Sequence, residues 1–556
     1  MKRSVVFGAL VLAASLLAVG FVGSSKNGTA ATGGTLVTLA NAAPSGSPDP
    51  QVDYTLQEWQ FLILTHDGLV GFKRAAGVEG TKIVPDLATS VPKPTNGGKT
   101  FTFTLRTGIK FSNGQTVTPA DVKATFVRLF KIGDSPNSGT WYNVIVGGDA
   151  CVKAPKACTL DRGITISGNK ITFHLTHGDP EFLDKLAVPF AFILPTGTPA
   201  KNVNMPPPGT GPYKWVEYAP NKEIKLVRNA YFHVWSAAAQ PAGSPDVILQ
   251  KFGLTVEAEV TAVENNQADW VFSGDQIPAD RLPELSTKYA NQVYVSPLTA
   301  IYYYAFNTRI PPFDNLKARQ GVNFATDHNA LVKIWGGPKL ASPTCQILPP
   351  NFPGYKPYCP YTVNPGSGTW TGPDFAKGQQ LVNASGTKGA SVKVNTDTNS
   401  ADKALGEYFV GLLDKLGYKA KLQALSPDIQ YPYVQNSKNK VEFAFSSWFQ
   451  DYPAASDFLN VLLGCGSFHP GSNSSPNIAE FCNQAIQAKM DQALKAGVTN
   501  PEAANAIWAQ VDKEVTDHAA WVALFNPKLI DFVSARVKNH VFSPQWYFLL
   551  DEASIK

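Results

Sequence analysis

The sequence lacks the short motifs by which many enzymes and metalloproteins are recognised. It contains no CxxC, no HExxH and no GxSxG, so zinc or thiol-redox sites, zinc-protease sites and serine-hydrolase sites are not indicated. Its 48 basic residues are scattered among 43 acidic ones and form no Lys/Arg stripe, which argues against nucleic acid as a partner. We therefore expect a binding protein rather than an enzyme, without cofactor, metal or nucleic acid.

Long apolar runs are absent after residue 30, so any membrane attachment must come through the N-terminus or a partner. Lys2 and Arg3 precede an uncharged apolar stretch, residues 5–22, and small polar residues follow. This is the layout of a secretory signal, although the apolar stretch is also long enough for an uncleaved anchor. No cysteine precedes Cys151, which excludes a lipoprotein anchor. Residues 1–30 are predicted to be a signal peptide or an N-terminal anchor, with the protein exported to the periplasm or to the outer face of the cytoplasmic membrane or cell wall.

The cysteines agree with export. There are 6 of them, and they fall into three locally spaced couples. An even number in an oxidising compartment favours disulfides, while zinc binding is the competing interpretation. The disulfide candidates are Cys151 and Cys158, Cys345 and Cys359, and Cys465 and Cys482.

Several stretches have clear secondary-structure signals. With 556 residues, 44% of them hydrophobic, the chain has material for two or three packed units. Residues 54–68 have the spacing of a helix. Residues 99–105 alternate apolar and polar side chains like a half-buried strand. A helix is predicted to follow, with Thr118 as N-cap and Pro119 at its first position.

Residues 391–424 predict a strand, a helix and a second strand. A crossover of this length implies parallel pairing, and residues 441–448 form another short strand. The stretch SSWFQDYP, residues 446–453, begins where that strand ends. In open parallel sheets ligands bind beyond the carboxyl ends of the strands, so Asp451 lies at a plausible ligand-binding edge. A carboxylate among aromatic side chains needs a hydrogen bond or a cation.

Four blocks of sequence, taken in order, resemble one family. They are PDLATSVPKPTNGGKTFTFTLRTGIKFSNGQTVTPADV (85–122), GTGPYKWVEYAPNKEIKLVRNAYF (209–232), YYYAFNTRIPPFDNLKARQGVNFATDHNAL (302–331) and FAFSSWFQDYP (443–453). Together they resemble the extracellular solute-binding proteins of family 5, the substrate-binding components of peptide and nickel ABC transporters. The chain departs from the family pattern where Ala454 and Ala455 follow Pro453.

The resemblance implies an α/β, two-lobe, periplasmic-binding-protein-like fold of type II, with an extra subdomain and a ligand cleft between the lobes. The implied division is lobe I over 31–298, with an inserted subdomain near 66–185, lobe II over 299–522, and a return of 523–556 to lobe I. It also implies an extracytoplasmic receptor, expected to be a monomer, that captures peptides between closing lobes and delivers them to the permease subunits of an ABC importer.

The same resemblance suggests ligand-binding residues. In peptide-binding members the acid corresponding to Asp451 pairs with the peptide's α-ammonium, and Trp448 is the neighbouring aromatic. Tyr303, Trp141 and Tyr142 are further candidates for the cleft lining. Two alternatives for Asp451 stay open: it caps a helix beginning near Pro453, or it lies in a solvated loop.

Three functions are compatible with these features. The first is a peptide receptor. The second is the same receptor for another solute, such as a nickel chelate, an oligosaccharide or another small organic molecule. The third is an exported hydrolase whose catalytic groups assemble from distant parts of the chain.

Overall fold

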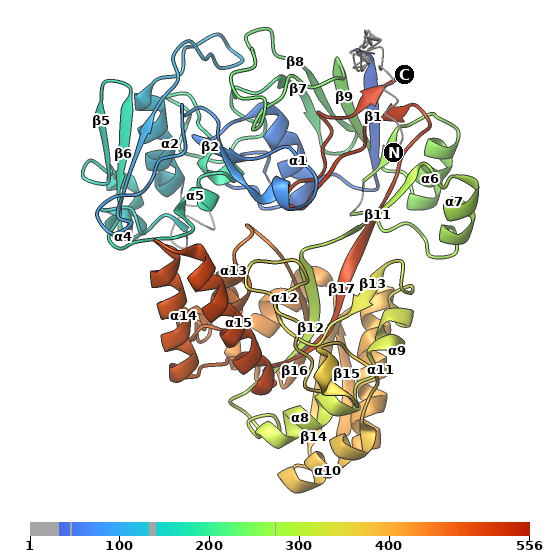
Figure 1. Ribbon diagram of the computed structural model, residues 1–556. Coiled ribbons are helices and arrows are strands. Elements are labelled where there is room, and N and C mark those ends of the chain that lie inside the picture. The colour runs from blue at the N-terminus through green and yellow to red at the C-terminus, as the bar shows by residue number, and fades with distance from the viewer. Residues whose placement is uncertain (1–32, 45–46, 133–140, 273) are drawn as a thin grey trace, which may run out of the picture.

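The computed structural model describes residues 33–44, 47–132, 141–272 and 274–556. The expected signal peptide or anchor, residues 1–30, lies outside them. The described chain forms two lobes, each with its own β-sheet and helices (Figure 1). This confirms the expected two-lobe α/β architecture, while the limits of the domains at residues 298 and 522 stay predictions.

Lobe I is built on a five-stranded mixed sheet in the order β10-β1-β9-β8-β7. Strand β1 pairs in parallel with β9 and β10, and β8 pairs antiparallel with β7 and β9. The helices of this lobe outside the subdomain are α1, α6 and α7. The bounds are β1 Thr35–Ala40, β7 Tyr213–Ala219, β8 Glu223–Arg228, β9 Val247–Phe252, β10 Trp270–Val271, α1 Leu56–Thr65, α6 Val256–Glu264 and α7 Leu282–Lys288.

A subdomain at one end of lobe I contains the three-stranded antiparallel sheet β4-β6-β5 (Figure 1). The predicted strand forms as β4, where Phe101 and Phe103 are buried and Thr102 is exposed. The predicted helix forms as α2, with Thr118 and Asp121 completing a capping box. The bounds are β2 Val70–Phe72, β3 Ile83–Pro85, β4 Thr100–Thr104, β5 Ile164–Ser167, β6 Lys170–His174, α2 Pro119–Lys131, α4 Gly148–Lys153 and α5 Phe182–Lys185.

Lobe II has three layers, because helices cover both faces of its sheet. Strands β12, β16, β14 and β15 follow one another across the sheet. The predicted strand–helix–strand unit is β14-α11-β15 with parallel pairing, and β16 joins β14 in parallel. One face packs on α13, α14 and α15, and the other on helices from α8 to α11. The bounds are β12 Ala300–Phe306, β13 Ala341–Pro343, β14 Ser391–Asp397, β15 Lys419–Leu425, β16 Phe443–Phe449, α8 Leu316–Ala325, α9 His328–Ile334, α10 Phe375–Ser385, α11 Ser400–Leu416, α12 Pro427–Gln435, α13 Ala455–Leu463, α14 Gln484–Gly497 and α15 Pro501–Asp517.

Two long segments connect the lobes. The chain enters lobe II through β11, Val293–Pro297, which leads directly into β12. It leaves along β17, Trp521–Phe532, which pairs with β12 at its start and with β11 at its end. Strand β17 therefore spans both lobes, and the C-terminal segment packs on lobe I (Figure 1). That segment holds the short strands β18 Val537–Lys538, β19 Phe542–Ser543, β20 Tyr547–Phe548 and β21 Ser554–Ile555.

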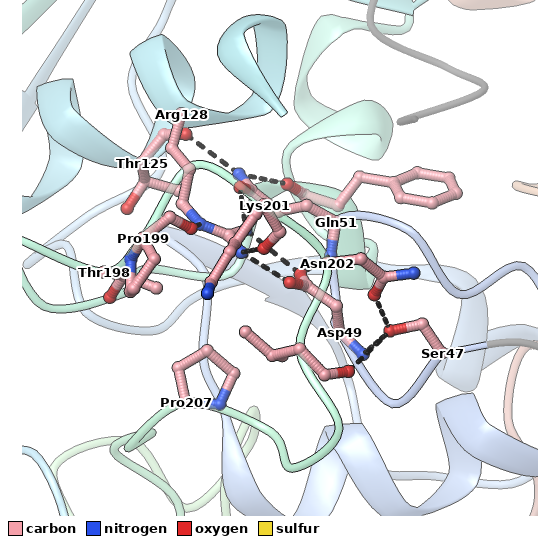
Figure 2. A network of polar contacts seen from close by, with 12 residues as sticks. Ser47, Asp49, Gln51, Thr125, Arg128, Thr198, Pro199, Lys201, Asn202 and Pro207 are labelled. Carbon is pink, nitrogen blue, oxygen red and sulfur yellow. Dashed lines mark hydrogen bonds and ion pairs between the residues drawn. The ribbon is translucent and has the colours of Figure 1, made fainter. Parts of the chain in front are cut away.

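A buried polar network joins the subdomain helix α2 to the start of lobe I (Figure 2). The guanidinium of Arg128 forms a salt bridge with Asp49, and both side chains are almost fully buried. It also donates to the side-chain oxygen of Gln51 at 2.6 Å and to the carbonyl oxygens of Pro199 and Lys201 at 2.8 and 3.1 Å. A buried charge needs such partners, so this network holds three separate segments in one arrangement.

Three disulfides connect the cysteines as the local couples predicted. Cys151 joins Cys158, Cys345 joins Cys359 and Cys465 joins Cys482, and the described residues contain no free cysteine. Each bridge closes a short loop, so each stabilises local structure rather than linking the lobes. Within the described part of the chain, no helix is both long and apolar enough to cross a bilayer.

Candidate ligand-binding site

A cavity of about 930 Å³ lies where the two lobes meet. Its size is in the range that small-molecule and peptide sites occupy. Aromatic and aliphatic side chains dominate its lining, which comes from the start of α1, the segment after β10, the strands that connect the lobes and the end of β16. The lining residues used below are Tyr54, Trp59, Tyr302, Trp448, Phe449, Gln450, Asp451, Lys528 and Gln545.

Asp451 lies at the edge of this cavity, just past the end of β16. Its carboxylate accepts a hydrogen bond of 2.6 Å from the hydroxyl of Tyr54, which belongs to lobe I. Its backbone N–H donates to Asp457, and its carbonyl accepts from Gln545. The backbone of Asp451 is thus fixed on both sides, while its carboxylate faces the cavity with one hydroxyl donor.

The electrostatics of this carboxylate are unusual. Burial raises the pKa of Asp451 to about 7, although hydrogen bonds from Tyr54 and Asp457 lower it. Burial also raises the pKa of Asp457 well above its ordinary value, and the charge of Asp451 raises it further. Among the described residues, no lysine, arginine or histidine forms an ion pair with Asp451. When Asp451 is ionised, it therefore has no counter-charge among the described residues, and a cationic ligand would stabilise its charged form.

The helix-cap interpretation of Asp451 is wrong. Helix α13 begins at Ala455 and its N-cap residue is Ala454, which offers no side-chain acceptor. The acid in its first turn is Asp457, whose carboxylate accepts from the backbone of Asp451 and, at 3.4 Å, from the indole N–H of Trp448. Residues 452–454 therefore separate Asp451 from the helix.

Trp448 lines the cavity beside Asp451, and its role in ligand binding stays a prediction. Its indole nitrogen is held by Asp457, so the ring has a fixed orientation next to the carboxylate. The indole face is the best aromatic surface for a cation. Asp451 and Trp448 are the two candidate residues that the structure brings together in the cavity.

Tyr303 does not line the cavity, and this corrects the sequence prediction. It is 1% exposed and stacks on Trp521 with ring centroids 3.6 Å apart, in the layer under α13–α15. The preceding residue, Tyr302, faces the cavity. Side chains alternate along a strand, so neighbouring tyrosines of β12 point to opposite faces, and the prediction chose the wrong one.

Trp141 and Tyr142 are also absent from the cavity lining. Both are buried in the core of lobe I, and the Tyr142 hydroxyl donates to the carbonyl of Lys185. Trp141 packs edge-on against Tyr54 and Tyr452, with centroids 6.5 and 5.5 Å apart. Its contribution is indirect, because it supports the tyrosine that donates to Asp451.

The sequence prediction missed Tyr54 and Lys528. Tyr54 precedes α1 and is 44% exposed, and no local pattern distinguishes it, because its partner lies in the other lobe. Lys528 did have a signal. It is the single charge in the apolar stretch WVALFNPKLI, residues 521–530, and the reasoning that singled out Asp451 applies to it equally.

Metal binding has no support in the described residues, which contain no cluster of three or more metal-ligating side chains. The candidate site is instead a largely apolar cavity with one carboxylate and one ammonium group in its lining.

Known proteins of similar sequence and structure are solute-binding proteins. The heme-binding protein A of Haemophilus influenzae is 26% identical over 87% of this chain and 85% of its own length. The dipeptide-binding protein of Escherichia coli is 23% identical over 94% and 95%. In structure, clavulanic acid biosynthesis oligopeptide binding protein 2 superposes with a TM-score of 0.83 at 22% identity, covering 94% of this chain and 96% of that one.

Residues 82–470 match the family described as bacterial extracellular solute-binding proteins, family 5. The match covers most of the chain and includes parts of both lobes and the Asp451 segment. It confirms the resemblance found in the sequence blocks. The protein belongs to family 5 of the bacterial extracellular solute-binding proteins.

Proposed function

We propose that this protein is the extracytoplasmic receptor of an ABC importer and that it captures peptides in the cavity between its lobes. Asp451 binds the α-ammonium of the peptide, and Trp448 contacts the same group or the first side chain. The observation that carries the proposal is the Asp451 carboxylate, which faces the cavity with Tyr54 as its hydroxyl donor and without an ion-pair partner among the described residues.

The physical argument concerns charge. A carboxylate with a pKa raised to about 7 by burial is stabilised in its ionised form when a cation approaches. A charge-assisted hydrogen bond from an ammonium group is short and directional. The fixed indole of Trp448 adds a cation–π contribution of roughly 0.5–2 kcal/mol.

The relatives agree with a peptide but also include other solutes. Two proteins named above bind a dipeptide or an oligopeptide by their descriptions, and another binds heme. The free α-amine of a peptide is the group that would favour peptides over the other solutes of family 5 at Asp451. The receptor is proposed to act as an exported monomer, without catalytic activity, that hands its ligand to a membrane permease.

The first test compares peptides with free and blocked amines. Asp451→Asn removes the negative charge but keeps the shape, so it should weaken binding of Ala-Xaa-Ala tripeptides with a free amine by about 10–100-fold. The corresponding N-acetylated tripeptides should bind weakly to both proteins. Isothermal titration calorimetry measures both affinities.

The matched control is Glu407→Gln, which removes an exposed carboxylate from α11 whose single ion pair with a described residue is with Lys403. It should leave peptide affinity unchanged. An equal effect of Asp451→Asn on free and acetylated tripeptides would contradict the role of Asp451. Recovery of cleaved rather than intact peptide would support the hydrolase alternative and contradict the receptor.

A further inference from the structure

Asp457 is hydrogen-bonded to both candidate ligand-binding residues, Asp451 and Trp448. Its Oδ2 atom accepts from the backbone N–H of Asp451 at 2.9 Å and from the indole N–H of Trp448 at 3.4 Å. Asp457 is 1% exposed and does not belong to the cavity lining. It therefore lies behind the two residues that face the ligand, and one of its atoms fixes them relative to each other.

The place of Asp457 in its helix leaves it free for these contacts. It is the third residue of α13, where an acidic side chain commonly accepts from the backbone N–H of the N-cap residue. Here the N–H of the N-cap residue, Ala454, donates to the carbonyl of Tyr452 instead. The carboxyl group of Asp457 reaches past the start of the helix to Asp451, which lies 6 residues earlier in the chain.

Asp451 and Asp457 also form a carboxyl pair. Burial raises the pKa of Asp457 well above its ordinary value, and the charge of Asp451 raises it further. A hydrogen bond from Asp457 lowers the pKa of Asp451. When Asp451 is ionised, the proton of the pair therefore belongs to Asp457, which can donate it in a hydrogen bond to the Asp451 carboxylate.

The groups around the carboxyl pair give no counter-charge for a second ionised acid. Across the lobe boundary lies another acid, Glu181, and Lys185 beside it is paired with Asp179 and Glu181 at 2.8 and 3.8 Å. The two phenols that face the pair are already used, because Tyr54 donates to its first member and Tyr452 donates to Glu181. One retained proton is therefore the arrangement that costs least free energy.

We propose that Asp457 is a positioning residue, which holds the Asp451 carboxylate and the Trp448 indole in the arrangement that receives the ammonium group of the ligand. It accepts through Oδ2 and donates to Asp451 through its other oxygen, without touching the ligand. A binding group recognises its ligand well only when packing and hydrogen bonds hold it to within about 0.5 Å. This inference rests on the proposed function, because it names the residue that orients the same ammonium site.

The test compares free-amine and N-acetylated Ala-Xaa-Ala tripeptides on variants of Asp457 by isothermal titration calorimetry. Asp457→Leu keeps a buried side chain of similar size but removes both the acceptor and the donor. Its affinity for free-amine tripeptides should fall about 10–100-fold, and its affinity for the acetylated ones should fall less than about threefold. Asp457→Asn retains an acceptor and a donor, so it should bind free-amine tripeptides within about threefold of the wild type.

The matched control is Asp512→Leu. Asp512 is also a 1% exposed acid of lobe II that accepts from backbone N–H groups, and it does not line the cavity. This variant should keep the preference of the wild type for the free amine, whatever its stability. Thermal unfolding verifies folding, and serine replaces leucine at both positions if either leucine variant does not fold.

The location of the proton has a separate, spectroscopic test. The infrared difference spectrum of the wild type minus Asp457→Asn, recorded at neutral pH, should contain the C=O stretch of a protonated carboxyl group, because asparagine cannot hold this proton. Absence of that band would contradict donation by Asp457.

Two binding results would overturn the positioning role. They are an unchanged affinity when Asp457 is replaced by leucine or serine, and an equal loss for free-amine and acetylated tripeptides, which indicates a merely structural residue. Either result would leave peptide binding at Asp451 intact. Absence of binding of every free-amine tripeptide to the wild type would overturn both this inference and the proposed function.

Discussion

At the scale of single residues, the site depends on a carboxylate that the protein itself does not neutralise. Asp451 has a hydroxyl donor in Tyr54 and a buried carboxyl neighbour in Asp457, but no ion pair with a described residue. Burying a charge in this way costs free energy. A cationic ligand recovers part of that free energy and a neutral ligand does not, so the buried carboxylate makes the site selective for cationic ligands.

This arrangement predicts that ligand affinity depends on pH. Because the pKa of Asp451 in the free protein is raised to about 7, the carboxyl group is protonated below that pH and must lose its proton to bind an ammonium. Between pH 5.5 and 7 the affinity for free-amine tripeptides should rise by up to about tenfold per pH unit, and then level off. Calorimetry at pH 6 in buffers of different ionisation enthalpy should detect a released proton.

Asp451→Asn is the control for this dependence, since it removes the Asp451 carboxyl group; the buried Asp457 remains and loses the neighbouring charge that raises its pKa. The weaker affinity of this variant should change less between pH 5.5 and 7 than the affinity of the wild type. A wild-type affinity that does not change over this interval would contradict the raised pKa as part of recognition.

At the scale of elements, the direction in which a side chain leaves its strand or helix decides its role. Tyr302 and Tyr303 are neighbours of the same type, and only the first reaches the cavity. Helix α2 likewise presents Arg128 inward, where it meets Asp49. The sequence pattern predicted the helix, but the partner of its arginine lies in another segment.

The Arg128 network should be essential for stability. Arg128→Met leaves Asp49 buried without its counter-charge, so the free energy of unfolding should fall by about 3–5 kcal/mol. Urea unfolding followed by tryptophan fluorescence measures the change. By comparison, Lys403→Met breaks only an exposed pair and should change stability by less than about 1 kcal/mol. A loss of similar size in both variants would be inconsistent with the buried network.

At the scale of the whole molecule, a pair of hydrogen bonds joins the two lobes away from the cavity lining. Glu181, near α5 in lobe I, accepts hydrogen bonds from Tyr452 and from Ser456 at the start of α13 in lobe II. Helix α13 faces α5 across the boundary between the lobes (Figure 1). Because these bonds need the two lobes to be in contact, we expect them to favour closure of the lobes, although neither Tyr452 nor Ser456 lines the cavity.

The closed arrangement of the lobes should therefore become less stable when these two hydrogen-bond donors are removed. The double variant Tyr452→Phe, Ser456→Ala loses two hydrogen bonds of about 0.5–1.5 kcal/mol each, which should reduce peptide affinity about 5–100-fold. The dissociation rate should increase more than the association rate decreases. Small-angle X-ray scattering with saturating tripeptide should show whether closure is still reached. Unchanged affinity and unchanged dissociation would rule out this role for the pair.

Much of the fold was predictable from the sequence because its signals are local. The alternation of Phe101 and Phe103, the cap at Thr118 and the strand–helix–strand unit of lobe II all depend on residues close together in the chain. The disulfide couples are local as well. These predictions were confirmed, since each depends on residues that are near one another in the sequence.

Local patterns along the chain were enough to indicate the family, the two-lobe fold and the position of Asp451 at the end of a strand. What surrounds that carboxylate became visible only in the folded molecule: Tyr54 from the other lobe, Tyr302 rather than Tyr303, and Lys528 across the connecting strands. Helix and strand signals arise within a few residues, whereas a binding site arises where distant segments pack together. The charges of Asp451 and Lys528 are visible in the sequence, but their sharing one cavity is a property of the fold alone.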